Sequence, residues 1–126
     1  MIMVTGGAFQ GKRDFVKKQF ALSDSDIADG GSRDLSELTN ARCVCNYERA
    51  VKRMISDSID PLEFTAGLNC EIVIINEIGG GIIPIEKSER EWREMTGRAG
   101  CILADRAEKV YRLCCGIATM IKGEQA

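Results

Sequence analysis

One short segment near the N-terminus constrains the fold more than the rest of the sequence does. An apolar, β-branched run, Met1–Thr5, stops at the glycine pair Gly6-Gly7, and a Gly-Lys pair follows at Gly11-Lys12. The stretch Gly11–Leu22 then places apolar side chains at helical spacing, with basic residues between them. A buried strand, a glycine-rich turn and a helix in this order predict an α/β domain with the turn at the carboxyl end of a sheet strand.

The turn Gly6–Lys12 matches the pattern GxxxxGK. Glycines at these positions let successive backbone N–H groups point inward at phosphate oxygens, and the helix N-terminus adds its positive end. A lysine at the end of the turn reaches the β- and γ-phosphates. We therefore predict a nucleoside triphosphate site, for ATP or GTP; its expected residues are Gly6, Gly7, Ala8, Gln10, Gly11, Lys12 and Arg13. The alternative is a plain glycine turn in which Lys12 is solvated.

Arg13 departs from this pattern. A Ser or Thr normally follows the lysine, and its hydroxyl ligates Mg²⁺. A guanidinium is itself a cation and cannot ligate one. Three interpretations stay open: the metal is held by other groups, Arg13 replaces part of its charge, or the loop no longer supports catalysis.

The rest of the chain alternates strand-like and helix-like segments. Strands are expected at residues 41–46, 71–75, 110–115 and 117–121, and helices at 34–38, 47–59, 61–68, 88–97 and 100–108. The run Ile72–Ile75 indicates a strand buried on both faces, as in a parallel sheet. The polar segment 23–32 is expected to be a loop. We therefore predict one P-loop NTPase-like α/β domain over residues 1–126: a mainly parallel sheet flanked by helices, with an antiparallel edge strand at its C-terminal end.

Composition narrows the classes of partner. The net charge of −2 gives no electrostatic footprint for nucleic acid, and no apolar run approaches the length of a membrane span. No basic residues precede the apolar N-terminus, so a cytoplasmic protein without a signal peptide is expected. The chain has six cysteines and no histidine, which excludes a Cys/His zinc site. Four of these cysteines lie in apolar strand-like runs, which favours reduced, buried thiols over a redox or metal role.

Glu77 is the second candidate catalytic residue. It lies just beyond the end of the strand predicted at 71–75, where ligands bind in open α/β sheets. A carboxylate there can act as a general base or organise a metal ion. The glycines at 79–81 would let the backbone approach a ligand closely. The alternative is an exposed acid beside a glycine-rich loop.

The sequence resembles a known family in two regions. The opening residues 3–8 with Gly11-Lys12, and more specifically residues 76–84, where Asn-Glu-Ile-Gly is followed by Gly-Ile-Ile-Pro, are similar to the bifunctional adenosylcobinamide kinase/adenosylcobinamide-phosphate guanylyltransferases. Residues 92–98, with Trp-Arg-Glu and Gly-Arg, and the closing residues 115–122 resemble the same family. The middle region 23–70 is unmatched and contracted.

The resemblance implies a role in cobalamin biosynthesis. Family members phosphorylate adenosylcobinamide with a nucleoside triphosphate and then transfer GMP through a guanylylated histidine, and they assemble as homo-oligomers. By this resemblance Gly6, Gly7, Gly11 and Lys12 would hold the triphosphate, and Glu77 would lie near the phosphates. Histidine-linked guanylyl transfer is not expected, because the chain has no histidine. Two hypotheses remain: a cobinamide kinase, or a catalytically degenerate module that binds a nucleotide or corrinoid as a regulator or partner.

Overall fold

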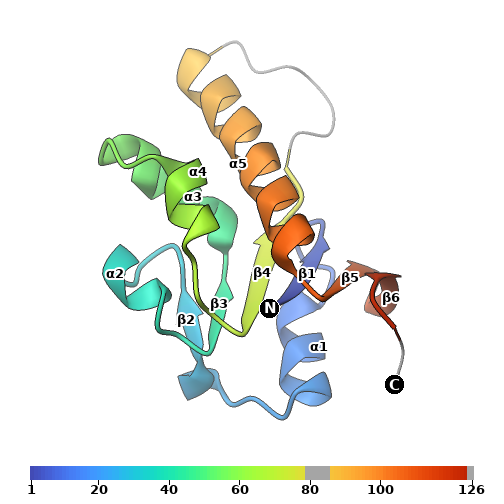
Figure 1. The fold of residues 1–126 in the computed structure, drawn as a ribbon. Helices are drawn as coiled ribbons and strands as arrows, with labels where there is room; N and C mark the ends of the chain where they lie inside the picture. The colour runs from blue at the N-terminus through green and yellow to red at the C-terminus, as the bar shows by residue number, and fades with distance from the viewer. Residues whose placement is uncertain (79–85, 125–126) are drawn as a thin grey trace.

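The computed structural model describes residues 1–78 and 86–124, and they form one six-stranded sheet (Figure 1). The strand order is β2-β3-β4-β1-β5-β6. All neighbouring strands are parallel except the final pair, β5 and β6, which is antiparallel. The strands are β1 (Ile2–Gly6), β2 (Ile27–Asp29), β3 (Cys43–Cys45), β4 (Ile72–Asn76), β5 (Lys109–Cys114) and β6 (Ile117–Lys122). The predicted sheet, including its antiparallel edge, is confirmed.

Helices cover both faces of this sheet. They are α1 (Lys12–Gln19), α2 (Leu35–Leu38), α3 (Tyr47–Ser56), α4 (Pro61–Ala66) and α5 (Lys87–Arg106). Successive residues of a strand face opposite ways, so Met3 packs with α3 and α5 whereas Val4 packs with α1. The side chains of β4 alternate between the faces of the sheet in the same manner, with Val73 and Ile75 on one face and Ile72 and Ile74 on the other. The consecutive apolar residues of β4 are therefore explained by burial on both faces.

Two segments differ from the sequence-based prediction. Helix α5 is one continuous helix, whereas two helices were expected with a break near Gly97. Gly97 and Gly100 each cost the helix only about 1 kcal/mol. The buried Ala99 and Leu103 hold these turns against the sheet. The expected loop at 23–32 contains strand β2, preceded by a 3-10 turn at Asp24–Asp26. A three-residue edge strand is too short to show a periodic pattern.

The cysteines divide evenly between core and surface. Cys43, Cys45 and Cys70 are buried, and burial raises the pKa of the Cys43 thiol to about 12. Cys114 and Cys115 are exposed, which corrects the expectation that they are buried strand residues. Cys114 is the last residue of β5 and lies on the exposed face of that strand. Cys115 lies in the turn before β6, with a φ of 51°. Among the described residues, no helix combines the length and apolarity that crossing a bilayer requires.

Candidate functional site

The glycine-rich turn connects the sheet to α1 as the motif requires. Strand β1 lies between β4 and β5 and ends at Gly6, and α1 begins at Lys12 after Gly11, whose φ is 88°. A hollow of about 270 Å³ lies between this turn and the carboxyl ends of β3 and β4. Its lining includes five of the predicted residues, Ala8, Gln10, Gly11, Lys12 and Arg13. The Phe9 side chain is fully exposed. We call this space the phosphate hollow.

Gly6 is the position in the turn that least tolerates a side chain. Its φ is 145°, and a Cβ atom there would lie 2.5 Å from the Leu113 carbonyl oxygen of β5. We expect Gly6→Ala to lower the free energy of unfolding by about 2 kcal/mol, because backbone strain and the clash with a central strand act together. Gly7→Ala is the matched control: its Cβ would meet only the Gln10 side chain at 3.8 Å. Urea unfolding of both variants measures the difference, and equal stabilities would contradict the assignment of strain to Gly6.

Lys12 points back into the turn. It is 6% exposed, and its Nζ donates a hydrogen bond to the Gly7 carbonyl oxygen. Burial lowers the pKa of Lys12, and the charges of Glu48 and Glu77 act against that shift. A desolvated ammonium at the N-terminus of a helix is stabilised by an anion. The geometry therefore suits a bound phosphate.

Glu48 is a site residue that the sequence analysis missed. It lies in the first turn of α3, its side chain is 4% exposed, and its carboxylate accepts a hydrogen bond from the Asn76 backbone N–H at 3.0 Å. The Trp92 indole N–H donates to the Glu48 carbonyl oxygen at 2.7 Å. A buried carboxylate thus links α3 to the end of β4, beside Lys12. Its only sequence signal was an acid just after a buried strand, which is the same signal that identified Glu77.

Glu77 lies at the carboxyl end of β4, where the sequence placed it. Its backbone N–H donates to the Gly6 carbonyl oxygen at 2.8 Å, which ties it to the start of the glycine-rich turn. Its carboxylate accepts two hydrogen bonds from Arg112 of β5, at 2.7 and 3.0 Å. These hydrogen bonds from Arg112 hold the pKa of Glu77 below its ordinary value. The adjoining glycines at 79–81 lie outside the described residues.

The surroundings of Arg13 do not fit a magnesium ion. Arg13 donates to Asp24 at 3.1 Å and contacts the Cys45 sulfur at 3.8 Å. A cationic side chain thus stands at the position of the usual hydroxyl ligand. Strand β3 ends beside the phosphate hollow in the thiol of Cys45, where a Mg²⁺ ligand would need to be a carboxylate. No cluster of three metal-ligating side chains occurs in residues 1–78 and 86–124. These residues offer Mg²⁺ no set of hard oxygen ligands of their own.

The turn between β5 and β6 is hydrogen-bonded to the glycine-rich turn. The Gln10 side-chain oxygen accepts a hydrogen bond from the Cys115 backbone N–H, and the Gly116 N–H donates to the Gln10 carbonyl oxygen at 3.0 Å. Gly11 also lies close to Gly116, since a Cβ atom on Gly11 would be 3.6 Å from the Cα atom of Gly116. The predicted residue Gln10 therefore fixes the shape of the turn as well as lining the hollow.

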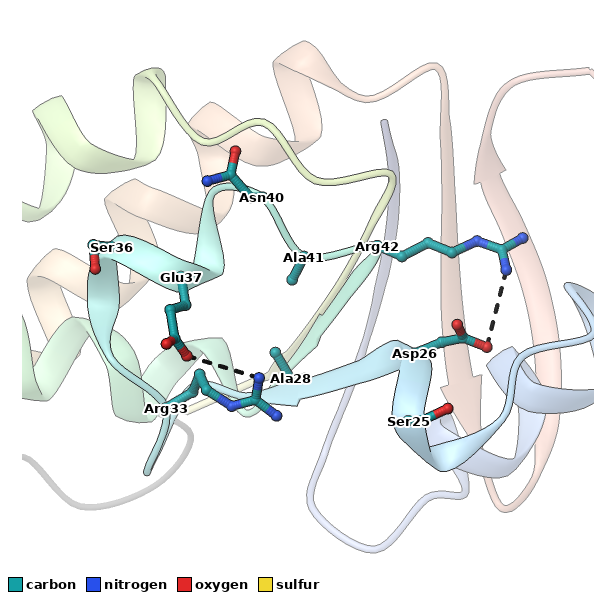
Figure 2. A pocket seen from close by; sticks show the side chains of 9 residues that line it. All are labelled: Ser25, Asp26, Ala28, Arg33, Ser36, Glu37, Asn40, Ala41 and Arg42. Atoms are coloured by element: carbon teal, nitrogen blue, oxygen red, sulfur yellow. Dashed lines mark ion pairs between the residues drawn. The ribbon is translucent and has the colours of Figure 1, made fainter.

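A hollow of about 680 Å³ at the β2 edge of the sheet is a weaker candidate (Figure 2). Its charged side chains are paired with each other, Arg33 with Glu37 at 3.8 Å and Arg42 with Asp26 at 3.9 Å. It contains none of the residues of the glycine-rich turn. Its charges are already balanced, so the phosphate hollow remains the candidate site.

Comparison with known proteins gives two matches. A family described as cobinamide kinase / cobinamide phosphate guanyltransferase matches residues 34–121. The bifunctional adenosylcobalamin biosynthesis protein CobU of Salmonella typhimurium is 34% identical over 76 residues, which covers 58% of this chain and 41% of that protein. The matched region therefore amounts to about two fifths of that relative's length. The family match includes Glu48 and Glu77 and extends through residues 34–70, which corrects the expectation that the middle region 23–70 is unmatched. It begins after the glycine-rich turn, which is identified by its motif and geometry.

Proposed function

Because the chain belongs to the cobinamide kinase / cobinamide phosphate guanyltransferase family, we propose that it binds a nucleoside triphosphate at Gly6–Lys12 and acts in cobalamin biosynthesis. The triphosphate is that of ATP or GTP. We also propose that the protein works in the cytoplasm as a homo-oligomer, and that the corrinoid partner is adenosylcobinamide.

The observation that carries this proposal is the buried ammonium of Lys12. Its pKa is lowered by burial, and it lies in the turn that joins the central strand β1 to the N-terminus of α1. Phosphate oxygens would accept the hydrogen bonds of the ammonium, in place of the water that solvates an exposed lysine. Backbone N–H groups of the turn would bind the same phosphates.

The contacts of Arg13 support nucleotide binding that does not depend on Mg²⁺. We expect calorimetry to give dissociation constants for GTP or ATP that agree within about threefold in Mg²⁺ and in EDTA. In Arg13→Ser a hydroxyl returns to the ligand position, so Mg²⁺ should then tighten binding by about tenfold. Lys17→Ser is the control, because Lys17 also pairs with Asp24, at 2.9 Å, and lies one helical turn farther along α1. A wild-type protein that needs Mg²⁺ to bind either nucleotide would contradict this proposal.

Phosphoryl transfer to a cobinamide hydroxyl is the second candidate function. The position of Glu77 favours it, because its backbone is bonded to Gly6 and its charge acts on Lys12. The acceptor oxygen would form a bond to the γ-phosphorus, the bond from that phosphorus to its bridging oxygen would break, and the hydroxyl proton would pass to Glu77. Incubation with adenosylcobinamide and γ-labelled nucleotide tests this, and labelled product that persists in Glu77→Gln would assign the proton to another group. Guanylyl transfer through a histidine is not proposed, since the chain has none.

A further inference from the structure

The Arg13 guanidinium lies where a P-loop protein would hold its metal ion. In such proteins Mg²⁺ is held by the hydroxyl that follows the lysine and by a carboxylate from another strand. Here the corresponding residues are Arg13 and Cys45, the last residue of β3, and both line the phosphate hollow. The Nη1 atom of Arg13 lies 3.8 Å from the Cys45 sulfur. The guanidinium therefore occupies the space between the two positions that would ligate the metal.

The Cys45 thiol is a weak partner for this guanidinium. Burial raises the pKa of the Cys45 thiol, so the thiol is neutral at neutral pH, and a neutral sulfur accepts hydrogen bonds only weakly. Of the described residues, three cations, Lys12, Arg13 and Arg49, line the hollow, together with one acid, Asp14. The excess of positive charge suits a polyanion, and phosphate oxygens are stronger acceptors for a guanidinium than a thiol is.

Asp24 holds the other side of the guanidinium, away from the hollow. The Nη2 atom of Arg13 donates to an Asp24 carboxylate oxygen at 3.1 Å, and the Lys17 ammonium donates to the same oxygen at 2.9 Å. Asp24 does not line the hollow, and its side chain is 70% exposed. An ion pair this exposed adds little to stability, and Lys17 would still neutralise Asp24 without Arg13. Arg13 can therefore exchange Asp24 for a phosphate at small cost.

We propose that the Arg13 guanidinium binds the β- and γ-phosphates of the nucleotide in place of Mg²⁺, and that Asp24 holds Arg13 before the nucleotide binds. The planar guanidinium donates to two phosphate oxygens at once, and the metal that it replaces bridges these two phosphates. This rests on the proposed nucleotide site, because Lys12 and the glycine-rich turn place the phosphates beside Arg13. The ligand is then the free triphosphate rather than its magnesium complex.

Arg13→Ala tests the proposal, with GTP in EDTA as the calorimetric probe. We expect GTP to bind this variant about tenfold more weakly than the wild type, because charge-assisted hydrogen bonds to two phosphates are lost. GMP has neither phosphate and should bind the variant within about twofold of the wild type. Arg33→Ala is the matched control: Arg33 is 53% exposed, pairs with Glu37 at 3.8 Å and does not line the phosphate hollow. It should change GTP affinity by less than about twofold.

Asp24→Asn gives a second test that keeps Arg13 in place. It weakens the competing partner of the guanidinium, so GTP in EDTA should bind about twofold to threefold more tightly than to the wild type. Equal GTP binding by wild type and Arg13→Ala, an equal loss in Arg33→Ala, or binding by Asp24→Asn no tighter than by the wild type would overturn the inference and leave the Lys12 site intact. GTP binding by the wild type only with Mg²⁺ would overturn it as well. No GTP binding by the wild type in either EDTA or Mg²⁺ would instead refute the proposed function.

Discussion

Replacing Lys12 with alanine is expected to weaken ATP or GTP binding by about 100-fold. The ammonium is enclosed by the glycine-rich turn, where its attraction to phosphate is screened little by water. The charge-assisted hydrogen bonds that it would donate to two phosphates are among the strongest that a side chain makes. Calorimetric titration of the variant with either nucleotide measures the loss.

Lys17→Ala is the matched control for this variant. Lys17 lies on the same helix, but its ammonium pairs with Asp24 rather than facing the phosphate hollow. Its removal should change nucleotide affinity by less than about twofold. If the two lysine variants weakened binding equally, the effect would be one of overall charge, and the assigned role of Lys12 would be wrong.

Replacing Glu48 with alanine should destabilise the fold by about 3 kcal/mol. The change removes the acceptor of the Asn76 backbone N–H and leaves the buried Lys12 ammonium without one of its two compensating charges. It also creates a cavity beneath α3. Urea unfolding, with the slope compared between variant and wild type, measures the loss.

Two further variants show which property of Glu48 causes the loss of stability. Glu48→Gln keeps an oxygen for the Asn76 backbone N–H but removes the charge and the second acceptor, which faces the Asn76 side-chain amide at 3.5 Å. Its loss of stability should therefore lie between those of wild type and Glu48→Ala. Glu71→Ala removes an acid whose side chain is 69% exposed and pairs with Arg42 at the surface, and it should change stability by less than about 1 kcal/mol. A small effect of Glu48→Ala, similar to that of Glu71→Ala, would show that water reaches the Glu48 position.

The features that the sequence predicted are those set by local patterns. The glycine-rich turn is bounded by a β-branched run and an amphipathic helix, so its place at the end of a strand followed from neighbouring residues. Strand β4 was identifiable because its four consecutive apolar residues suit burial on both faces. Glu77 was placed at the carboxyl edge by the same reasoning.

The features that the sequence did not predict depend on contacts between distant residues. Arg13 is satisfied by Asp24 and Cys45, which belong to two other elements of the fold. Glu77 is paired with Arg112, 35 residues away, because β4 and β5 lie on either side of the end of β1. The burial of Glu48 likewise requires α3 to pack against the end of β4. Local periodicity carries no information on such pairings.

The hydrogen bonds on both sides of the glycine-rich turn determine how much the protein must rearrange when a ligand binds. The turn is fastened to β4 through Gly6 and to the β5–β6 hairpin through Gln10, so its backbone is already shaped before any ligand arrives. When a binding site already has its bound shape, little of the binding free energy is spent on ordering the protein. Rearrangement on binding is then confined to side chains at the rim, and the hairpin becomes part of the binding machinery although none of its side chains needs to touch the ligand.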